Sequence, residues 1–187
     1  MKILLTAINA KFIHSNPAIY SLRAFAGEEF REYIELAEYT INNKMEEILA
    51  DIYSRKPDVI AFSCYIWNRE LVTKLVTELP KVLPEVDIWL GGPEASYDAE
   101  NLLKKHQSLT GVMIGEGEET FWELAKYYCT DASLVEIQGI AYRASTSAEN
   151  KICVTPSGKS AEDKICVTPS RQPTDMSKLP FLYEDLN

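Results

Sequence analysis

Apolar, strand-like segments alternate with amphipathic, helix-like segments over the first two thirds of this chain, and this order constrains its fold more than any other feature. The strand-like segments lie at residues 2–9, 31–42, 57–67 and 86–92 and at the beginning of 111–128, and the helix-like segments at 16–30, 43–56, 68–84 and 98–108 and in the rest of 111–128. Such a succession of strand–helix units predicts a parallel sheet with helices on both faces. The segment 137–144 is a further candidate strand.

Few topologies fit this order, because crossover connections between parallel strands are right-handed. We expect an open, flavodoxin-like (Rossmann-like) parallel five-stranded sheet with helices on both faces, plus a small C-terminal β extension. The strand order of dinucleotide-binding domains is the alternative. A ligand of such a sheet lies beyond the carboxyl ends of the strands, where the strand order reverses. The candidate binding loops are therefore 9–16, 63–68, 91–97 and 115–119.

The composition limits the classes of partner. The 187 residues include 46% hydrophobic and 25% charged residues, as expected of a globular chain with a sizeable core. The formal net charge of −9 argues against nucleic acid, because an acidic surface repels phosphates. No apolar run approaches the roughly 20 residues that a membrane-spanning helix needs. We therefore expect a cytoplasmic protein that binds neither nucleic acid nor membrane.

A short duplication follows the alternating region. The sequence SAENKICVTPS at 147–157 recurs as SAEDKICVTPS at 160–170, and the copies differ only in Asn150 against Asp163. Two strand-sized copies are too few for a repeat architecture, so we expect a duplicated, β-hairpin-like extension at the sheet edge. Polar and proline-bearing residues follow, as is typical of a linker. The expected organisation is an α/β domain at 1–144, the duplicated extension at 145–170 and a linker at 171–187.

The third and fourth candidate strands end in residues that suit a binding site. The sequence SCYIWN includes Ser63 and Tyr65, a hydroxyl and an aromatic face that fit a flat ligand with polar edges. Gly91 and Gly92, which precede Pro93, allow close backbone approach or a positive φ. Ordinary packing of the aromatic ring and an ordinary strand-end turn are the alternatives.

The sequence contains no convincing catalytic or metal-binding constellation. GEGEET, which includes Gly115 and Glu116, is a weak dinucleotide fingerprint, because Thr120 replaces its last glycine and it does not follow the first strand. The chain has only two histidines, and His14 has no carboxylate or cysteine near it in the sequence. A lone histidine is a poor metal site. We therefore expect neither catalytic residues nor side-chain metal ligands.

Taken together, the four loops resemble those of the cobalamin-binding domain that precedes the catalytic barrel in radical S-adenosylmethionine proteins. The resemblance covers residues 1–143 and rests on NAKFIHSN after the first strand, SCYIWN after the third, GGPEASYD after the fourth and GEGEETF after the fifth. The tail MSKLPFLYEDL resembles the linker that leads into such a barrel. The resemblance implies cobalamin as the cofactor, and a C-terminal radical S-adenosylmethionine barrel as the partner of this domain in a longer protein.

The resemblance also implies roles for the loops. In such domains the nucleotide tail of cobalamin is drawn down beside the sheet, and the corrin ring rests on the strand ends. Here Ser63 would hydrogen-bond the tail, Gly91 and Gly92 would let it pass close to the backbone, and the loop at 9–14 would lie beneath the corrin. The implied cofactor-binding residues are Asn9, Lys11, Phe12, His14, Ser63, Tyr65, Gly91, Gly92, Pro93, Gly115 and Glu116.

The chain departs from the family's cobalt-ligating motif, Asp-x-His-x-x-Gly. It has Asn9 in place of Asp, Lys11 in place of His and His14 in place of Gly. The resemblance thus implies base-off cobalamin without a histidine ligand, which would leave the cobalt exposed to a reaction partner on its upper face and would suit methyl transfer. No CxxxCxxC sequence is present. An iron–sulfur cluster and S-adenosylmethionine are therefore expected only in the missing barrel, and this domain alone has no complete active site.

Two other functions stay open at this point. The loss of Asp-x-His-x-x-Gly favours a vestigial α/β domain that binds no cofactor and docks on the barrel or on a protein substrate. A flavodoxin-like nucleotide or flavin binder is disfavoured, because no phosphate loop follows the first strand. Binding of a corrinoid distinguishes the cofactor domain from the docking domain.

Overall fold

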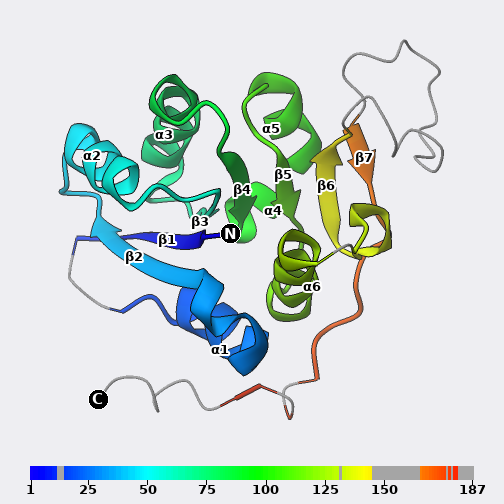
Figure 1. Ribbon diagram of the computed structural model, residues 1–187. Helices are drawn as coiled ribbons and strands as arrows, with labels where there is room; N and C mark the ends of the chain where they lie inside the picture. Colours follow the sequence, from blue (N-terminus) through cyan, green and yellow to red (C-terminus); the bar gives the residue numbers. More distant parts are fainter. Residues whose placement is uncertain (12–14, 131, 145–164, 176, 178, 181–187) are drawn as a thin grey trace.

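Strands and helices alternate as the sequence predicts (Figure 1). The computed structural model describes residues 1–11, 15–130, 132–144, 165–175, 177 and 179–180. The strands are β1 (Ile3–Asn9), β2 (Ile34–Thr40), β3 (Val59–Ser63), β4 (Asp87–Gly91), β5 (Gly111–Met113), β6 (Ile140–Arg143) and β7 (Ile165–Val167). The α-helices are α1 (Pro17–Phe30), α2 (Met45–Arg55), α3 (Arg69–Val82), α4 (Pro93–Ser96), α5 (Ala99–Lys105) and α6 (Glu118–Cys129), with 3-10 helices η1 (Arg31–Tyr33) and η2 (Leu134–Glu136). None of the helices in the described ranges is long and apolar enough to cross a membrane.

The strand order of the sheet is β2-β1-β3-β4-β5-β6-β7. The pairs from β2 to β5 are parallel, and β1 pairs with β3 from Ile3 opposite Val59 to Ala7 opposite Ser63. The order of the first five strands confirms the flavodoxin-like prediction, and the dinucleotide-binding alternative is wrong. The order reverses between β1 and β3, so the loops after these strands lie at the topological switch point.

The sheet has seven strands, and the prediction of five was wrong. β6 pairs antiparallel with β5, and β7 pairs antiparallel with β6. α6 ends near the amino edge of the sheet, where the Tyr128 hydroxyl donates to Asp87 Oδ2 (2.8 Å). Residues 132–139 lead to the carboxyl edge, where the Ile114 amide donates to the Gly139 carbonyl (2.7 Å). This return reverses the direction of β6, and the C-terminal β extension continues the same sheet.

The second copy of the duplicated sequence supplies the edge strand β7. The first copy lies outside the described residues, so the hairpin-like pairing of the two copies stays a prediction. The division into a domain, an extension and a linker likewise stays a prediction.

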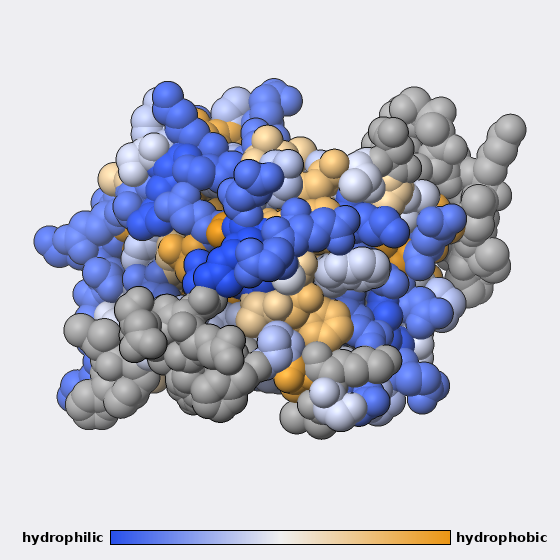
Figure 2. Space-filling view, turned by 60° about the horizontal axis from the view of Figure 1, so that its bottom comes forward, coloured by the Kyte–Doolittle hydropathy of each residue, from blue (hydrophilic) through white to orange (hydrophobic). Residues whose placement is uncertain are grey.

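Helices cover both faces of the sheet, α2, α3 and α5 on one and α1 and α6 on the other (Figure 1). Leu4 and Ile8 of β1 belong to the core under the first group, and Ile3, Leu5 and Ala7 belong to the core under the second. Successive side chains of a strand point to opposite faces, so a run of apolar residues fills both cores. Figure 2 brings the lower side of Figure 1 forward and shows apolar residues gathered in the middle of the view, with hydrophilic residues around them.

Polar side chains join the beginning of α1 to the end of β1. Asn16 caps the helix, because its Oδ1 accepts from the Ala18 amide (3.1 Å), and Pro17 occupies the first helical position. The Asn16 Nδ2 group donates to Asn9 Oδ1 (3.2 Å), and the Asn16 amide donates to Glu38 Oε1 (2.7 Å). These contacts hold the entry into α1 against β1 and β2.

Trp89 of β4 is the largest fully buried side chain. Its Nε1 group donates to the Tyr128 hydroxyl (2.8 Å), which in turn donates to Asp87 Oδ2. Burial, together with the negative charge of Asp87, raises the pKa of Tyr128, so its hydroxyl stays protonated and able to donate. On the neighbouring strand, Gly111 leaves the space that the indole fills, since a Cβ there would lie 2.3 Å from Trp89 Cζ3.

Candidate functional site

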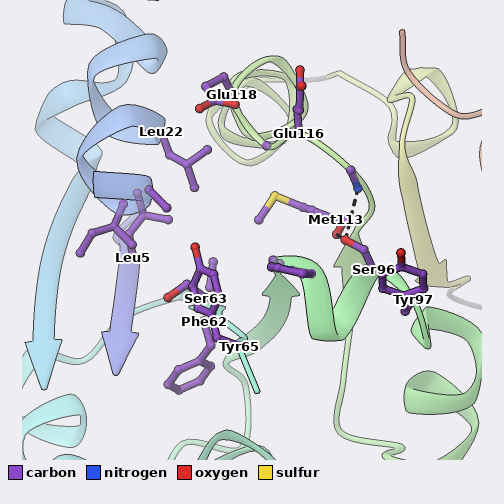
Figure 3. Close-up of a pocket in the computed structure, with 18 residues that line it drawn as sticks. Leu5, Leu22, Phe62, Ser63, Tyr65, Ser96, Tyr97, Met113, Glu116 and Glu118 are labelled. Atoms are coloured by element: carbon purple, nitrogen blue, oxygen red, sulfur yellow. Dashed lines mark hydrogen bonds between the residues drawn. The ribbon is translucent and has the colours of Figure 1, made fainter. Parts of the chain in front are cut away.

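A cavity of about 470 Å³ opens at the carboxyl ends of β3, β4 and β5. Its remaining walls come from α1, from α4 and from the loop that begins α6 (Figure 3). Much of the lining is apolar, as is usual in sites for small molecules and cofactors. Seven of the residues that the sequence predicted to bind a cofactor line this cavity: Ser63, Tyr65, Gly91, Gly92, Pro93, Gly115 and Glu116.

Of the other four predicted residues, Asn9 ends β1 and Lys11 lies in the loop after it, and neither lines this cavity. Asn9 is buried and lines a separate hollow of about 270 Å³, to which Tyr65 also contributes. Lys11 is exposed, and its carbonyl accepts from Asn42 Nδ2 (3.2 Å). Phe12 and His14 lie outside the described residues.

The hydroxyl of Ser63 is a polar group in mainly apolar surroundings. Its Oγ atom is buried and has no hydrogen-bond partner among the described residues. Figure 3 shows Ser63 beside the space into which Leu22 of α1 and Met113 of β5 point from opposite sides. A buried polar group without a partner costs about 1–3 kcal/mol. Such an atom in a cavity wall is suited to a hydrogen bond with a ligand.

Gly92 lets two loops touch through their backbones. Its φ of 93° and ψ of 171° are accessible essentially to glycine alone. A Cβ at this position would lie 2.7 Å from the Cys64 carbonyl oxygen, and the Cys64 amide donates to the Gly91 carbonyl (2.7 Å). The β3–α3 and β4–α4 loops therefore form one continuous backbone wall that has no room for a side chain at Gly92.

The β5–α6 loop forms the opposite wall. Ser96 of α4 ties it to β5, because the Ser96 hydroxyl accepts from the Gly115 amide (3.2 Å) and donates to the Met113 carbonyl (3.4 Å). Glu118 accepts from the Ser21 hydroxyl of α1 (2.8 Å). Glu116 Oε2 accepts from the Thr174 amide (2.5 Å). The two carboxylates of this wall are thus engaged by α1 and by the segment after β7.

Sequence reasoning missed several residues of the cavity wall. Leu22 and Ala18 line it from α1, and their spacing of four residues marks one helix face without showing what that face covers. Met113 ends β5, where its apolar character indicated only a core position. Ser96 and Glu118 lie in two of the candidate loops, but nothing local singled out either residue, because their partners lie 17 to 97 positions away in the sequence.

Aromatic rings lie at the rim of the cavity. Tyr65 and Trp67 stack with centroids 4.6 Å apart and planes 4° from parallel, and Trp67 is 46% exposed. Tyr97, which also lines the cavity, is 94% exposed. Cys64, which precedes Tyr65, is a buried free thiol whose burial raises its pKa to about 11, so it stays protonated and is a poor nucleophile at neutral pH. The rim therefore offers flat apolar surface rather than reactive groups.

Within the described ranges, no group of three or more His, Cys, Asp and Glu side chains is arranged to hold a metal ion. The unpartnered Ser63 hydroxyl in a mainly apolar lining instead fits an organic group that enters the cavity and hydrogen-bonds at one point.

Comparison with protein families identifies the family of this chain. The B12 binding domain family matches residues 3–125. The chain belongs to the B12-binding domain family. This confirms the resemblance inferred from the sequence, and cobalamin, the predicted cofactor, is the one for which the family is named.

Two curated relatives of this B12-binding domain are methyltransferases. The cobalamin-dependent radical SAM methyltransferase TokK of Streptomyces tokunonensis is 32% identical over 94 residues, which cover 50% of this chain and 14% of TokK. The 2-(S-pantetheinyl)-carbapenam-3-carboxylate methyltransferase of Streptantibioticus cattleyicolor is 28% identical over 127 residues, covering 67% of this chain and 18% of that enzyme. The chain therefore spans less than a fifth of the length of either relative.

Solved structures share the fold. OxsB, a cobalamin-dependent S-adenosylmethionine radical enzyme with aqua-cobalamin and S-adenosylmethionine bound, superposes with a TM-score of 0.69 at 16% identity, over 96% of this chain and 23% of OxsB. The radical S-adenosylmethionine methyltransferase TsrM from Kitasatospora setae, with cobalamin and a [4Fe-4S] cluster bound, gives 0.58 at 16% identity, over 96% of this chain and 31% of TsrM. At these identities the likeness shows the fold alone.

Proposed function

We propose that this B12-binding domain holds cobalamin, with the nucleotide tail of the cofactor in the cavity between α1 and the β5–α6 loop. The observation that carries the proposal is the buried Ser63 hydroxyl, which has no partner among the described residues and lies at the carboxyl end of β3 beside the wall built around Gly92. Ser63 would hydrogen-bond the tail, and Gly91 and Gly92 would admit it close to the backbone. The half-buried ring of Tyr65 and the exposed ring of Tyr97, both in the cavity lining, would offer apolar surface to the corrin.

We further propose that the cobalamin is base-off and has no histidine ligand. Lys11 stands where the family motif has its histidine, and a protonated ammonium group is not a metal ligand. Asn9 stands where the motif has its aspartate, and its Oδ1 already accepts from Asn16. Neither described motif position is therefore equipped to ligate cobalt or to orient a ligand.

The proposed role of the whole protein is methyl transfer by a cobalamin-dependent radical S-adenosylmethionine enzyme. Bound cobalamin supplies a cobalt centre that can carry a methyl group. Two relatives in sequence are methyltransferases, and the chain spans only part of each. Because the sequence has no CxxxCxxC motif, the iron–sulfur cluster and S-adenosylmethionine would belong to a C-terminal barrel. This chain's part is to bind and orient the cofactor toward that barrel.

Replacing Ser63 with alanine should weaken cobalamin binding about tenfold while leaving the stability of the cofactor-free chain unchanged or slightly higher. The variant removes the proposed hydrogen bond to the tail, and in the free chain it removes only a polar atom that has no partner. Hydroxocobalamin retained after desalting, followed by its visible spectrum, measures binding, and urea unfolding measures stability. If the wild-type chain retains no corrin at high micromolar concentration, the proposal fails and the cofactor-free docking domain takes its place.

Replacing His14 with alanine should leave the visible spectrum of the bound cofactor unchanged, since no histidine ligand is proposed. Electron paramagnetic resonance of the bound, reduced Co(II) form should show no nitrogen splitting from an axial ligand in either protein. Lys11→Ala is the matched control, because it changes the position at which the family motif has its ligand. A shifted spectrum or lost nitrogen splitting in the His14 variant alone would show that this histidine ligates the cobalt.

A further inference from the structure

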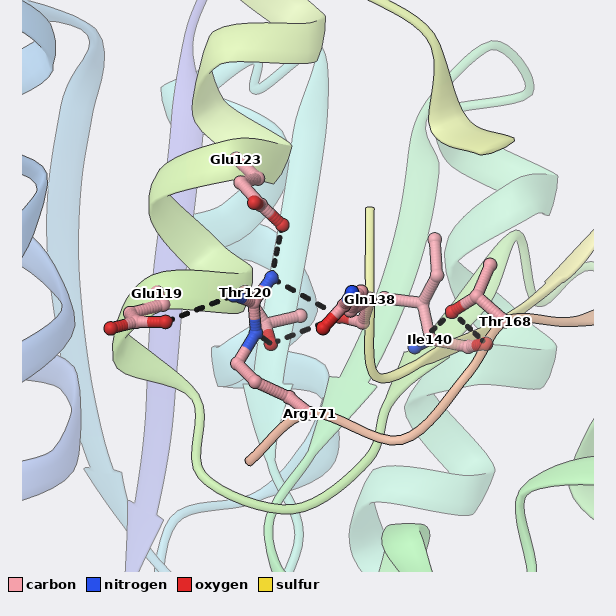
Figure 4. A network of polar contacts seen from close by, with 7 residues as sticks. All are labelled: Glu119, Thr120, Glu123, Gln138, Ile140, Thr168 and Arg171. Carbon is pink, nitrogen blue, oxygen red and sulfur yellow. Dashed lines mark hydrogen bonds and ion pairs between the residues drawn. The ribbon is translucent and has the colours of Figure 1, made fainter. Parts of the chain in front are cut away.

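The segment after β7 crosses the beginning of α6, where the Arg171 side chain contacts several hydrogen-bond acceptors (Figure 4). Arg171 Nη1 donates to Glu119 Oε2 (2.9 Å), Arg171 Nε donates to Thr120 Oγ1 (3.1 Å), and Arg171 Nη2 contacts the Glu123 carboxylate. The Arg171 side chain is only 12% exposed, so water screens these contacts less than it would on an open surface. Glu119 and Glu123 are one helical turn apart, and their like charges would repel each other without the guanidinium.

Three residues beyond the arginine, the same segment holds the wall of the cavity itself. The amide of Thr174, which is buried, donates to Glu116 Oε2 (2.5 Å), and Glu116 lines the cavity. Arg171 and Thr174 therefore fasten two successive stretches, the first turns of α6 and the loop that leads into them. Neither residue touches the cavity, and neither belongs to the part of the chain that the family match covers.

The duplication shows which contacts are particular to this segment. The backbone contacts that join β7 and the two residues after it to β6 and Gly139 are made by Ile165 to Pro169, whose sequence ICVTP is repeated unchanged thirteen positions earlier. Beyond the repeat, Arg171 Nη2 also donates to the Gln138 carbonyl (3.5 Å). Arg171 and Thr174 lie outside the repeat, and thirteen positions earlier the chain has Gly158 and Ala161. Strand pairing alone cannot distinguish the two copies, and the Thr174 contact uses a backbone amide that Ala161 also has. The guanidinium contacts to α6 can be made only after the second copy, because Gly158 has no side chain.

We propose that Arg171 and Thr174 are positioning residues that set the affinity of the cavity for the nucleotide tail of cobalamin. Without Arg171, the repulsion between Glu119 and Glu123 loosens the first turns of α6, and the Gly115–Glu118 wall loses its fixed position. The affinity for the tail falls, although no group in contact with the tail has changed. This inference rests on the proposed function, since it concerns the same cavity.

The test compares hydroxocobalamin with cobinamide, the corrinoid that lacks the nucleotide tail, on the 187-residue chain. In the Arg171→Ala variant the dissociation constant for cobalamin should rise about tenfold, while that for cobinamide stays within about twofold of the wild-type value. The dissociation constant of Arg171→Lys for cobalamin should lie between those of the wild type and of Arg171→Ala. A lysine ammonium group keeps the charge but cannot bind three acceptors in one fixed geometry. A merely structural role would weaken both ligands alike, so the ratio of the two constants reports on positioning.

Arg55→Ala is the matched control. Arg55 Nε donates to Asp51 Oδ2 (2.9 Å), and its Nη1 contacts Glu35, so this partly buried arginine also joins two carboxylates, at a place that does not line the cavity. In the Arg55→Ala variant, the ratio of the affinities for cobalamin and cobinamide should equal that of the wild type. An unchanged ratio in Arg171→Ala, or an equal loss for both ligands, would overturn the inference. A wild-type chain that does not prefer cobalamin to cobinamide would instead overturn the proposed tail site.

Discussion

Replacing Gly92 with alanine should destabilise the chain by about 4 kcal/mol and abolish retention of cobalamin. The methyl group would face the Cys64 carbonyl oxygen at 2.7 Å and the Cys64 amide nitrogen at 3.2 Å. Both are backbone atoms next to β3, so relief requires the two loops to separate. That separation would displace Ser63 and Gly91, which flank the contact and line the cavity.

Gly27→Ala provides the matched control for this prediction. Gly27 has nearly the same backbone conformation, with φ 69° and ψ −175°, but a Cβ there meets nothing within 4 Å. Its cost should be the backbone strain alone, about 2 kcal/mol, with cobalamin retained. Urea unfolding of both variants, and corrin retention below the unfolding midpoint, measure the difference. Equal losses of stability in the two variants would show that the loops separate freely and that the close contact at Gly92 is not required.

Replacing Trp89 with alanine should lower the free energy of unfolding by about 3–5 kcal/mol. The indole is fully buried in the core under α1 and α6, and the space that Gly111 leaves for it would become a cavity. The change also removes the donor that satisfies the Tyr128 hydroxyl. The effect should appear in urea or thermal unfolding as a lower midpoint.

Trp89→Phe separates packing from hydrogen bonding. Phenylalanine keeps most of the apolar volume and loses only the Nε1 donor, so the expected loss is about 1–2 kcal/mol. The Tyr128 hydroxyl keeps its bond to Asp87 in this variant. If Trp89→Phe proves as damaging as Trp89→Ala, the hydrogen-bond chain rather than the filled volume holds β4 to α6.

The succession of β1 to β5 and the helices between them could be predicted because the signals for it are local. The apolar run that contains Leu4, Leu5 and Ile8 is typical of a strand, and the structure buries all three. Asn16 and Pro17 predicted where α1 begins, and in the structure Asn16 caps the helix at that point. A candidate site at the strand ends then followed from the topology, because parallel strands bring their carboxyl ends to one edge.

The direction of β6 and the full width of the sheet could not be predicted in this way. The sequence of residues 130–139 shows no feature that requires it to return to the carboxyl edge, and that path is determined by where α6 packs and by the contact between Ile114 and Gly139. The duplicated sequence indicated a strand at the edge, and β7 is one, but its pairing with β6 depends on that same return.

The chain's sequence by itself determined the β–α alternation and the loops that follow the strands, since each depends on periodicity or on turn residues within a short segment. The structure decided between the flavodoxin-like strand order and its alternative. Only the tertiary structure decided that the Ser63 hydroxyl has no partner among the described residues and that a side chain at Gly92 would meet the Cys64 backbone. It likewise decided that Arg171 binds the carboxylates of α6. These depend on contacts between residues 28 to 52 positions apart, and no local pattern encodes what a buried atom meets across the fold.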